Sequence, residues 1–122
     1  MFYSETLPKS PTAPAAAREL LDRLHDRLST NTLDDARLLM SELVANAVEH
    51  VAEEGNIEVR LGVQEGVLRI EVLDPGPGFT HVPRSETAGD SDRGWGLVFL
   101  ERVATRWANE PGRVWFELDA GS

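Results

Sequence analysis

Two stretches of alternating apolar and polar residues constrain the fold of this 122-residue chain more than any other feature. In residues 57–63 and again in residues 68–72, every second side chain is apolar. This period of two is typical of strands that bury one face. Residues 64–66, which end in glycine, separate the two stretches and predict a hairpin turn. The chain therefore contains an antiparallel strand pair whose apolar face needs a second layer of structure.

Helices are expected to form that second layer. Apolar residues recur at helical spacing over residues 14–28, which begin with a proline, a residue tolerated in a first helical turn. The polar residues 29–31 end this pattern, and Thr32 is expected to cap a second helix that runs over residues 32–52. The spacing of apolar residues predicts a third helix over residues 96–107.

Shorter patterns in the sequence predict the remaining strands. Residues 1–12 are expected to form an N-terminal arm with one short edge strand at residues 2–7. A last strand is predicted for residues 113–118. Residues 75–93 are predicted to form a long loop, and loops of this length are usually functional. The order of elements predicts a single α+β domain over residues 1–122. It would have two layers, with three main helices on one face of a mostly antiparallel sheet.

The composition excludes several classes of function. The chain has 12 basic and 21 acidic residues and a formal net charge of −9, which argues against direct nucleic-acid binding. It has no cysteine, so disulfides, thiolate metal sites and cysteine nucleophiles are excluded. No apolar run approaches the length of a membrane span, and the N-terminus shows no signal-peptide pattern. A cytoplasmic protein without a membrane partner is therefore expected.

The second predicted helix carries the first candidate site. Glu42, Asn46 and His50 are four residues apart, so they stack along one line of the helix, and this line is expected opposite the apolar face. A carboxylate, an amide oxygen and an imidazole suit the binding of a hydrated Mg²⁺ and the activation of a hydroxyl group. The alternative is the ordinary polar face of a surface helix.

A second candidate site follows the hairpin directly. Residues 74–79 read Asp-Pro-Gly-Pro-Gly-Phe, and Gly76 and Gly78 permit positive φ angles and let a flat ligand approach the backbone. Asp74, at the end of a strand, is placed to accept a hydrogen bond from an exocyclic amine such as that of adenine. The alternative is a proline-glycine turn that the aspartate caps.

A third candidate site lies where the long loop gives way to the third predicted helix. The residues in question are Arg93, Gly94, Trp95, Gly96 and Leu97. Free amides at a helix start, flanked by glycines, form an anion site, and an arginine adds a charge-assisted donor for a phosphate. The alternative for this segment is an ordinary glycine-rich start of a helix. Trp95 is placed either to contact the loop or a protein partner, or to pack beneath the loop.

The order of these three segments resembles that of the GHKL (histidine kinase-like) ATPases. Residues 42–50 resemble the N-box of that superfamily, residues 74–78 its first glycine box and residues 94–97 its second. The small size and the closing strand at 113–118 are similar to stand-alone actinobacterial ATP-binding proteins related to anti-sigma-factor serine/threonine kinases. The resemblance implies a Bergerat-type ATP-binding fold in which residues 79–93 are the ATP lid.

The resemblance also implies ATP and Mg²⁺ as cofactors, with a role for each candidate residue. Glu42 would be the general base and Asn46 the Mg²⁺ ligand, whereas His50 fills an N-box position that is often polar or basic. Asp74 would recognise the adenine amine beside the wall formed by the first glycine box. The second glycine box, with the amide of Leu97, would hold the phosphates.

Two further positions complete this comparison. Arg93 would steady the γ-phosphate. Many relatives carry a threonine in the final strand beside the adenine-binding aspartate, and Arg113 stands at that place here. The resemblance therefore implies that one hydroxyl that usually supports adenine recognition is missing.

By this resemblance, the chain would phosphorylate a serine or threonine of an anti-sigma antagonist protein, bind a sigma factor and so regulate transcription, as a homodimer. An alternative of another class is a nucleotide-binding regulatory module that clamps a protein partner without catalysis, with Glu42 merely structural. A third option, a histidine-kinase catalytic domain, would need a preceding phosphoacceptor helix, and none is expected here.

Overall fold

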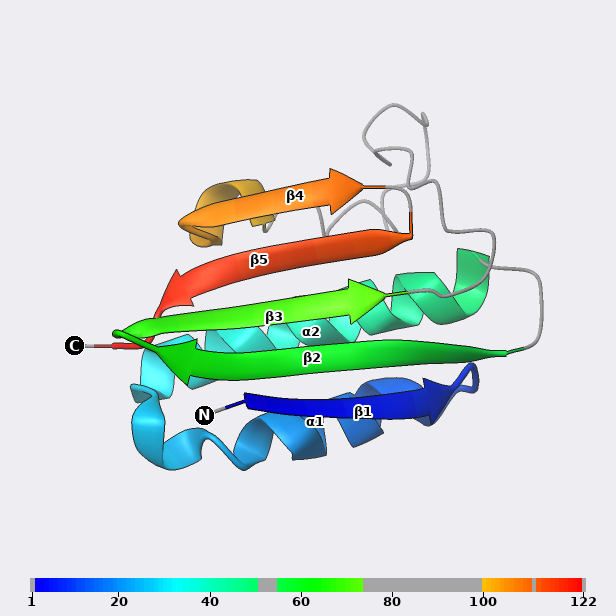
Figure 1. Ribbon diagram of the computed structural model, residues 1–122, viewed down its shortest axis with the longest axis horizontal. Coiled ribbons are helices and arrows are strands. Elements are labelled where there is room, and N and C mark those ends of the chain that lie inside the picture. Colours follow the sequence, from blue (N-terminus) through cyan, green and yellow to red (C-terminus); the bar gives the residue numbers. More distant parts are fainter. Residues whose placement is uncertain (1, 51–54, 74–99, 111, 122) are drawn as a thin grey trace.

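The computed structural model describes residues 2–50, 55–73, 100–110 and 112–121. These residues form two layers, a five-stranded sheet and a layer of helices on one of its faces (Figure 1). The strands are β1 (Phe2–Pro8), β2 (Asn56–Gln64), β3 (Val67–Leu73), β4 (Arg106–Glu110) and β5 (Arg113–Asp119). The helices are α1 (Ala13–Asp22), the short 3₁₀ helix η1 (His25–Arg27) and α2 (Thr30–His50), and residues 100–103 are also helical.

The sheet has the strand order β1-β2-β3-β5-β4, and all neighbouring strands in it are antiparallel. The edge strand predicted at residues 2–7 and the last strand predicted at residues 113–118 are present as β1 and β5. The predicted α+β architecture, with helices on one face of an antiparallel sheet, is confirmed.

The hairpin between β2 and β3 has a turn of two residues, one fewer than predicted. Gln64 pairs with Val67, so only Glu65 and Gly66 form the turn. Their φ angles are 52° and 77°. Two successive residues with positive φ give the turn whose twist matches that of the flanking strands, and this fixes the register of the hairpin.

The first two helices differ from their predicted limits. α1 ends at Asp22, well before the predicted end, because the chain tightens into η1. α2 begins at Thr30, and Ser29 is the capping residue, since the Thr32 amide donates to Ser29 Oγ over 3.1 Å. The expectation that Thr32 caps this helix was therefore wrong. Its hydroxyl instead donates to the carbonyl of Asp119 at 2.8 Å.

The predicted third helix is wrong over its C-terminal part. In the described residues that helix ends at residue 103, and β4 begins at Arg106. Trp107 pairs with Phe116 of β5, and Thr105 donates its amide and its hydroxyl to the Glu117 carbonyl, each over 2.9 Å. Pairing with β5 therefore overrides the helical spacing of the apolar residues.

The core fills the space between the sheet and the helices. Its largest fully buried side chains come from both layers and include Leu21, Leu24, Leu39, Met40, Leu43, Ile57, Leu61, Leu68, Ile70 and Phe116. The other face of the sheet, called the outer face below, is not covered by any of the described helices (Figure 1). Within the described ranges, no helix has both the length and the apolar character needed to cross a membrane.

Candidate functional site

The first candidate site lies in the C-terminal half of α2. This helix carries Glu42, Asn46 and His50 at intervals of four residues. Glu42 is half-buried, and Asn46 is buried, with only 4% of its surface exposed. His50 is the last residue of α2, and its side chain lies outside the part that the structure describes.

Asn46 does not lie opposite the apolar face of α2, as the sequence analysis expected. It follows Leu39 by seven residues, about two helical turns, and Leu43 by three, so the three side chains share one face. Leu39 and Leu43 are 1% and 2% exposed. Asn46 is therefore a polar group placed within the buried face of the helix, and the prediction of its position was wrong.

The carboxamide of Asn46 is not satisfied by the protein itself. Its Nδ2 atom is buried and has no hydrogen-bond partner among the described residues. Such a donor destabilises a fold by roughly 1–3 kcal/mol, so its presence calls for an explanation. The Oδ1 atom is a suitable ligand for Mg²⁺, which usually takes one or two protein oxygens together with phosphates of a substrate. The residue therefore fits the cofactor that the resemblance implies.

Glu42 lies one helical turn before the buried amide, and such positions are about 5–6 Å apart at Cβ. No hydrogen bond or ion pair joins its carboxylate to another described residue. The nearby arginines have other partners. Arg18 donates to Ser41 Oγ at 2.9 Å, and Arg37 forms an ion pair with Asp22. Among the described residues, the Glu42 carboxylate therefore has no hydrogen-bond or ion-pair partner.

The second and third candidate sites lie outside the described residues. Their members are Asp74, Gly76, Gly78, Arg93, Gly94, Trp95, Gly96 and Leu97. The described chain before them ends at Leu73, the last residue of β3. That end of β3 lies at the same end of the molecule as the C-terminal half of α2 (Figure 1). The strand that precedes Asp74 therefore leads toward the end of the molecule where Glu42 and Asn46 lie.

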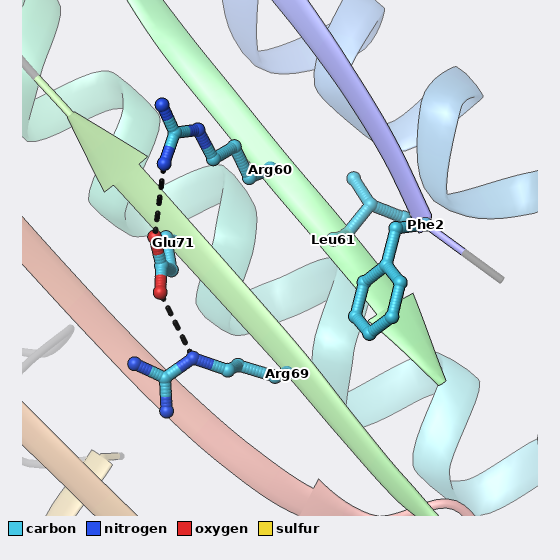
Figure 2. A pocket seen from close by; sticks show the side chains of 5 residues that line it. All are labelled: Phe2, Arg60, Leu61, Arg69 and Glu71. Carbon is cyan, nitrogen blue, oxygen red and sulfur yellow. Dashed lines mark hydrogen bonds and ion pairs between the residues drawn. The ribbon is translucent and has the colours of Figure 1, made fainter. Parts of the chain in front are cut away.

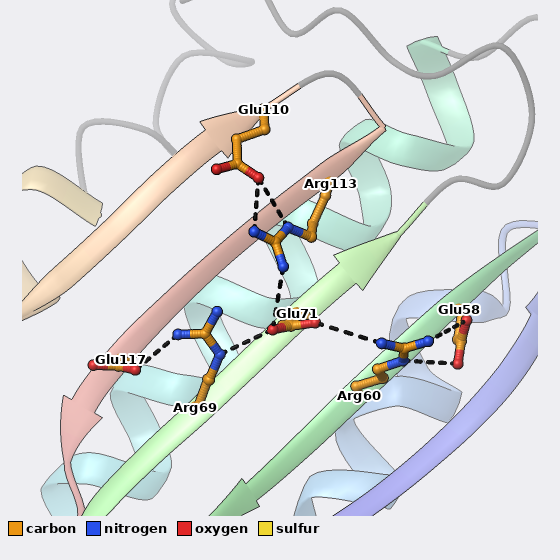
Figure 3. A network of polar contacts seen from close by, with 7 residues as sticks. All are labelled: Glu58, Arg60, Arg69, Glu71, Glu110, Arg113 and Glu117. Carbon is orange, nitrogen blue, oxygen red and sulfur yellow. Dashed lines mark hydrogen bonds and ion pairs between the residues drawn. The ribbon is translucent and has the colours of Figure 1, made fainter.

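Arg113, which stands in place of a threonine in the resemblance, faces away from the helices. It pairs with Leu73 across β3 and β5, and its guanidinium lies 2.8 Å from Glu110 and 3.7 Å from Glu71 (Figure 3). The next residue, Val114, is buried in the core. Because successive side chains of a strand face opposite sides of the sheet, position 113 belongs to the outer face. The arginine that replaces the threonine is therefore on the face of the sheet opposite to α2, the helix that carries Asn46.

The outer face carries a network of ion pairs that the sequence analysis missed (Figure 3). Glu71 is at its centre, with Arg69 at 2.9 Å, Arg113 at 3.7 Å and Arg60 at 4.0 Å. Arg69 also reaches Glu117 of β5 at 2.8 Å. The alternation of Arg and Glu at the polar positions of these strands was the available signal. It is sufficient for the pair of Arg69 with Glu71 within β3, but the cross-strand pairs can be predicted only when the strand register is known.

The carboxylates of this network favour the charged form of the arginines. The pKa of the Arg60 guanidinium is raised by its hydrogen bond to Glu58 and by the negative charge of the Glu58 carboxylate. Partial burial acts against the charge of Arg69, but the hydrogen bonds that it donates to Glu117 and Glu71 outweigh this and raise its pKa. Each arginine of the network is thus paired with a glutamate. Such pairing is typical of a surface that stabilises the fold rather than of a site for acid–base catalysis.

Two hollows of about 230 and 250 Å³ also lie on the outer face, and both are lined in part by Phe2 and Arg69. Figure 2 shows the first of them, which Arg60, Leu61 and Glu71 complete. Neither contains a residue of the predicted site. No group of three His, Asp or Glu side chains that could hold a metal ion occurs within the described ranges.

Comparison with known proteins shows to which family the chain belongs. The family model of the histidine kinase-like ATPase domain matches residues 7–114. Among solved structures, the chain is similar to the RsbU and RsbW domains of Rv1364c from Mycobacterium tuberculosis, with a TM-score of 0.68 and 22% sequence identity. That match covers 97% of this chain and 31% of the other chain. Because the sequence identity is low, the likeness is one of fold. No curated protein matches the chain. Because the family match spans most of its length, the chain belongs to the histidine kinase-like ATPase family, and this membership implies ATP binding.

Proposed function

We propose that this chain is an ATP- and Mg²⁺-dependent serine/threonine protein kinase of the anti-sigma-factor type. Its substrate is a small antagonist protein in the cytoplasm, and its second partner is a sigma factor whose action in transcription it regulates. The observation that carries the proposal is the buried amide of Asn46, one helical turn after the carboxylate of Glu42. Within the part of the chain that the structure describes, neither the Nδ2 atom of Asn46 nor this carboxylate has a hydrogen-bond partner. In a member of an ATPase family, this pair is suited to phosphoryl transfer.

In this proposal, Asn46 would hold Mg²⁺ through Oδ1. The chemistry that the cation would supply there is neutralisation of negative charge on the triphosphate. Asp74 accepts a hydrogen bond from the adenine amine, and Gly76 and Gly78 form the adjacent wall, where the absence of a Cβ atom lets the base approach. His50, the last residue of the N-box, is assigned the role of a polar side chain beside this site.

The phosphates are assigned to the segment around residue 95. The backbone amides of Gly94, Gly96 and Leu97 bind them, as amides at a helix start do, and Arg93 adds a charge-assisted hydrogen bond to the γ-phosphate. Trp95 lies between the two glycines in sequence and contacts the lid or the protein partner. Residues 79–93 are the lid that closes over the nucleotide.

Glu42 is assigned the role of general base. Its carboxylate takes the proton from the attacking serine hydroxyl while the serine oxygen forms a bond to the γ-phosphorus. The bond between this phosphorus and the oxygen that bridges to the β-phosphate breaks, and ADP leaves. Phosphoryl transfer of this kind depends mainly on positioning and on charge stabilisation, so few protein groups are needed.

The test combines nucleotide binding with transfer of labelled phosphate to an antagonist protein encoded beside this one. ATP with Mg²⁺ at a hundredfold excess over Kd is expected to stabilise the fold by about 2.7 kcal/mol, or several degrees in Tm. Glu42→Ala is expected to keep this shift and to lose transfer. The matched control is Glu19→Ala, at an exposed position of α1, which keeps both.

Each failure in this test points to a different conclusion. The absence of any shift at millimolar ATP would overturn the whole assignment. A normal shift without transfer by the unmodified chain would instead favour a nucleotide-binding regulator that clamps its partner without catalysis. Analytical ultracentrifugation tests the homodimer, which is also part of the proposal, and a monomer at all concentrations would remove it.

A further inference from the structure

The strand β4 lies at one edge of the sheet. Among the described residues it pairs with β5 alone, and no described strand lies along its other side (Figure 1). An edge strand presents backbone amides and carbonyls to which the strand of another chain can pair, unless the protein blocks them. The open side of β4 is therefore a candidate surface for association.

The sequence of β4 is complementary to itself when the strand is read in the opposite direction. It runs Arg-Trp-Ala-Asn-Glu, with a cation at one end, a small residue at the centre and an anion at the other end. In antiparallel pairing of two copies about Ala108, Arg106 of each copy is opposite Glu110 of the other. Opposite charges at such directly paired positions stabilise a sheet, and like charges destabilise it. A register centred on Trp107 or on Asn109 loses both charge pairs.

Both charged side chains can be reached from the outer face. Arg106 is 71% exposed, and its one ion pair among the described residues is with Glu117, at 3.7 Å. Glu110 is 47% exposed, and both contacts that Arg113 makes with it, at 2.8 and 2.9 Å, reach the Oε1 atom. No other described residue forms a hydrogen bond or an ion pair with the Oε2 atom of Glu110. Each end of β4 can therefore accept a further partner of opposite charge.

We propose that two copies of this chain associate through β4, antiparallel and about a two-fold axis at Ala108, so that their sheets join into one continuous sheet. This inference rests on the homodimer of the proposed function, to which it assigns a surface. The same strand lies on both sides of a two-fold interface, so the contact of Arg106 with Glu110 is made twice. The pairing satisfies edge backbone groups and charged side chains together.

The opposite edge of the sheet is less suited to a second copy. Pairing of β1 with itself over its full length places Glu5 of one copy opposite Glu5 of the other, and like charges at paired positions are destabilising. β1 also ends in Pro8, which has no amide to donate. The arrangement of charge thus favours β4 over β1 as the interface.

Two charge reversals in β4 test this inference on the full chain. Arg106→Glu and Glu110→Arg each place like charges opposite one another at both ends of the paired strands. Each variant alone should therefore dimerise at least about tenfold more weakly than the wild type in analytical ultracentrifugation. An equimolar mixture of the two variants should form heterodimers, detected by native mass spectrometry, because every pair is again between opposite charges.

The matched control is Arg27→Glu, which makes the same change of charge at an exposed position of η1 and should dimerise like the wild type. If a reversal does not fold, Glu110→Gln, which keeps the size of the side chain, should still weaken the dimer several-fold. An unchanged Kd in that variant would overturn the assignment of β4.

The outcomes separate this inference from the proposed function. A wild-type dimer that a folded Arg106→Glu variant leaves intact, or folded variants that form no heterodimer, would overturn the assignment of β4 and leave the homodimer in place. A wild-type chain that is monomeric at all concentrations would overturn both. The shift of Tm by ATP would then still decide the nucleotide-binding part of the proposed function.

Discussion

Replacing Glu71 with glutamine removes the charge at the centre of the outer-face network while keeping the size of the side chain. Glu71 is only 13% exposed, and it contacts Arg69, Arg113 and Arg60. The contact with Arg69 at 2.9 Å is a charge-assisted hydrogen bond, a type that contributes about 1.5–3 kcal/mol. The contacts at 3.7 and 4.0 Å involve arginines that are 37% and 53% exposed, so solvent screens these contacts and they add little to stability.

Together these contacts predict that Glu71→Gln lowers the free energy of unfolding by about 2 kcal/mol, because the glutamine oxygen retains part of the hydrogen bonding. With a urea m-value of about 2 kcal/mol per molar, the unfolding midpoint should fall by about 1 M. Urea is the suitable denaturant, since guanidinium chloride would screen the ion pairs.

The control for this prediction is Glu110→Gln. Glu110 is 47% exposed and, among the described residues, forms its ion pair with Arg113 alone, so its charge should contribute about 0.5 kcal/mol. Equal midpoints for the two variants would refute the reasoning, because they would show that solvent screens the centre of the network as fully as its edge.

Three further substitutions test other parts of the structure. Gly121→Ala should lower Tm by several degrees, since a Cβ there would overlap the side chain of Ser29 and the φ angle is +120°. An unchanged Tm would contradict the packing of the C-terminus against the start of α2. Ser29→Ala should cost about 1 kcal/mol in urea unfolding through loss of the helix cap, whereas the exposed Asn31→Ala should cost far less. Asp74→Asn should remove the Tm shift caused by ATP without changing the Tm of the free protein, and a retained shift would contradict the adenine assignment.

The strands that bury one face in the core could be predicted from the sequence. In β2, β3 and β5 the alternation of apolar residues was sufficient, because a period of two fixes which side chains enter the core. The position of β4 could not be predicted in the same way. Trp107 fits a helical stripe as well as it fits a strand, and only pairing with Phe116 decides between them.

The helix that carries Glu42 and Asn46 was predicted from the sequence, but the position of Asn46 on that helix was not. The polarity of the two residues suggested that both lie opposite the apolar face, and Asn46 is buried. Binary patterning assumes that polar residues face water, and the buried Asn46 breaks that assumption. The cross-strand ion pairs of Glu71 were missed for another reason, since such partners depend on a register that the sequence does not state.

Calorimetric titration of ATP into the wild-type chain, with Mg²⁺ and then with EDTA, is the most direct test of the central claim that the buried Asn46 belongs to a nucleotide site. The account predicts saturable binding with Mg²⁺ that becomes much weaker in EDTA, since the cation links the amide oxygen to the phosphates. Absence of binding at millimolar ATP, or equal affinity with and without the cation, would contradict it.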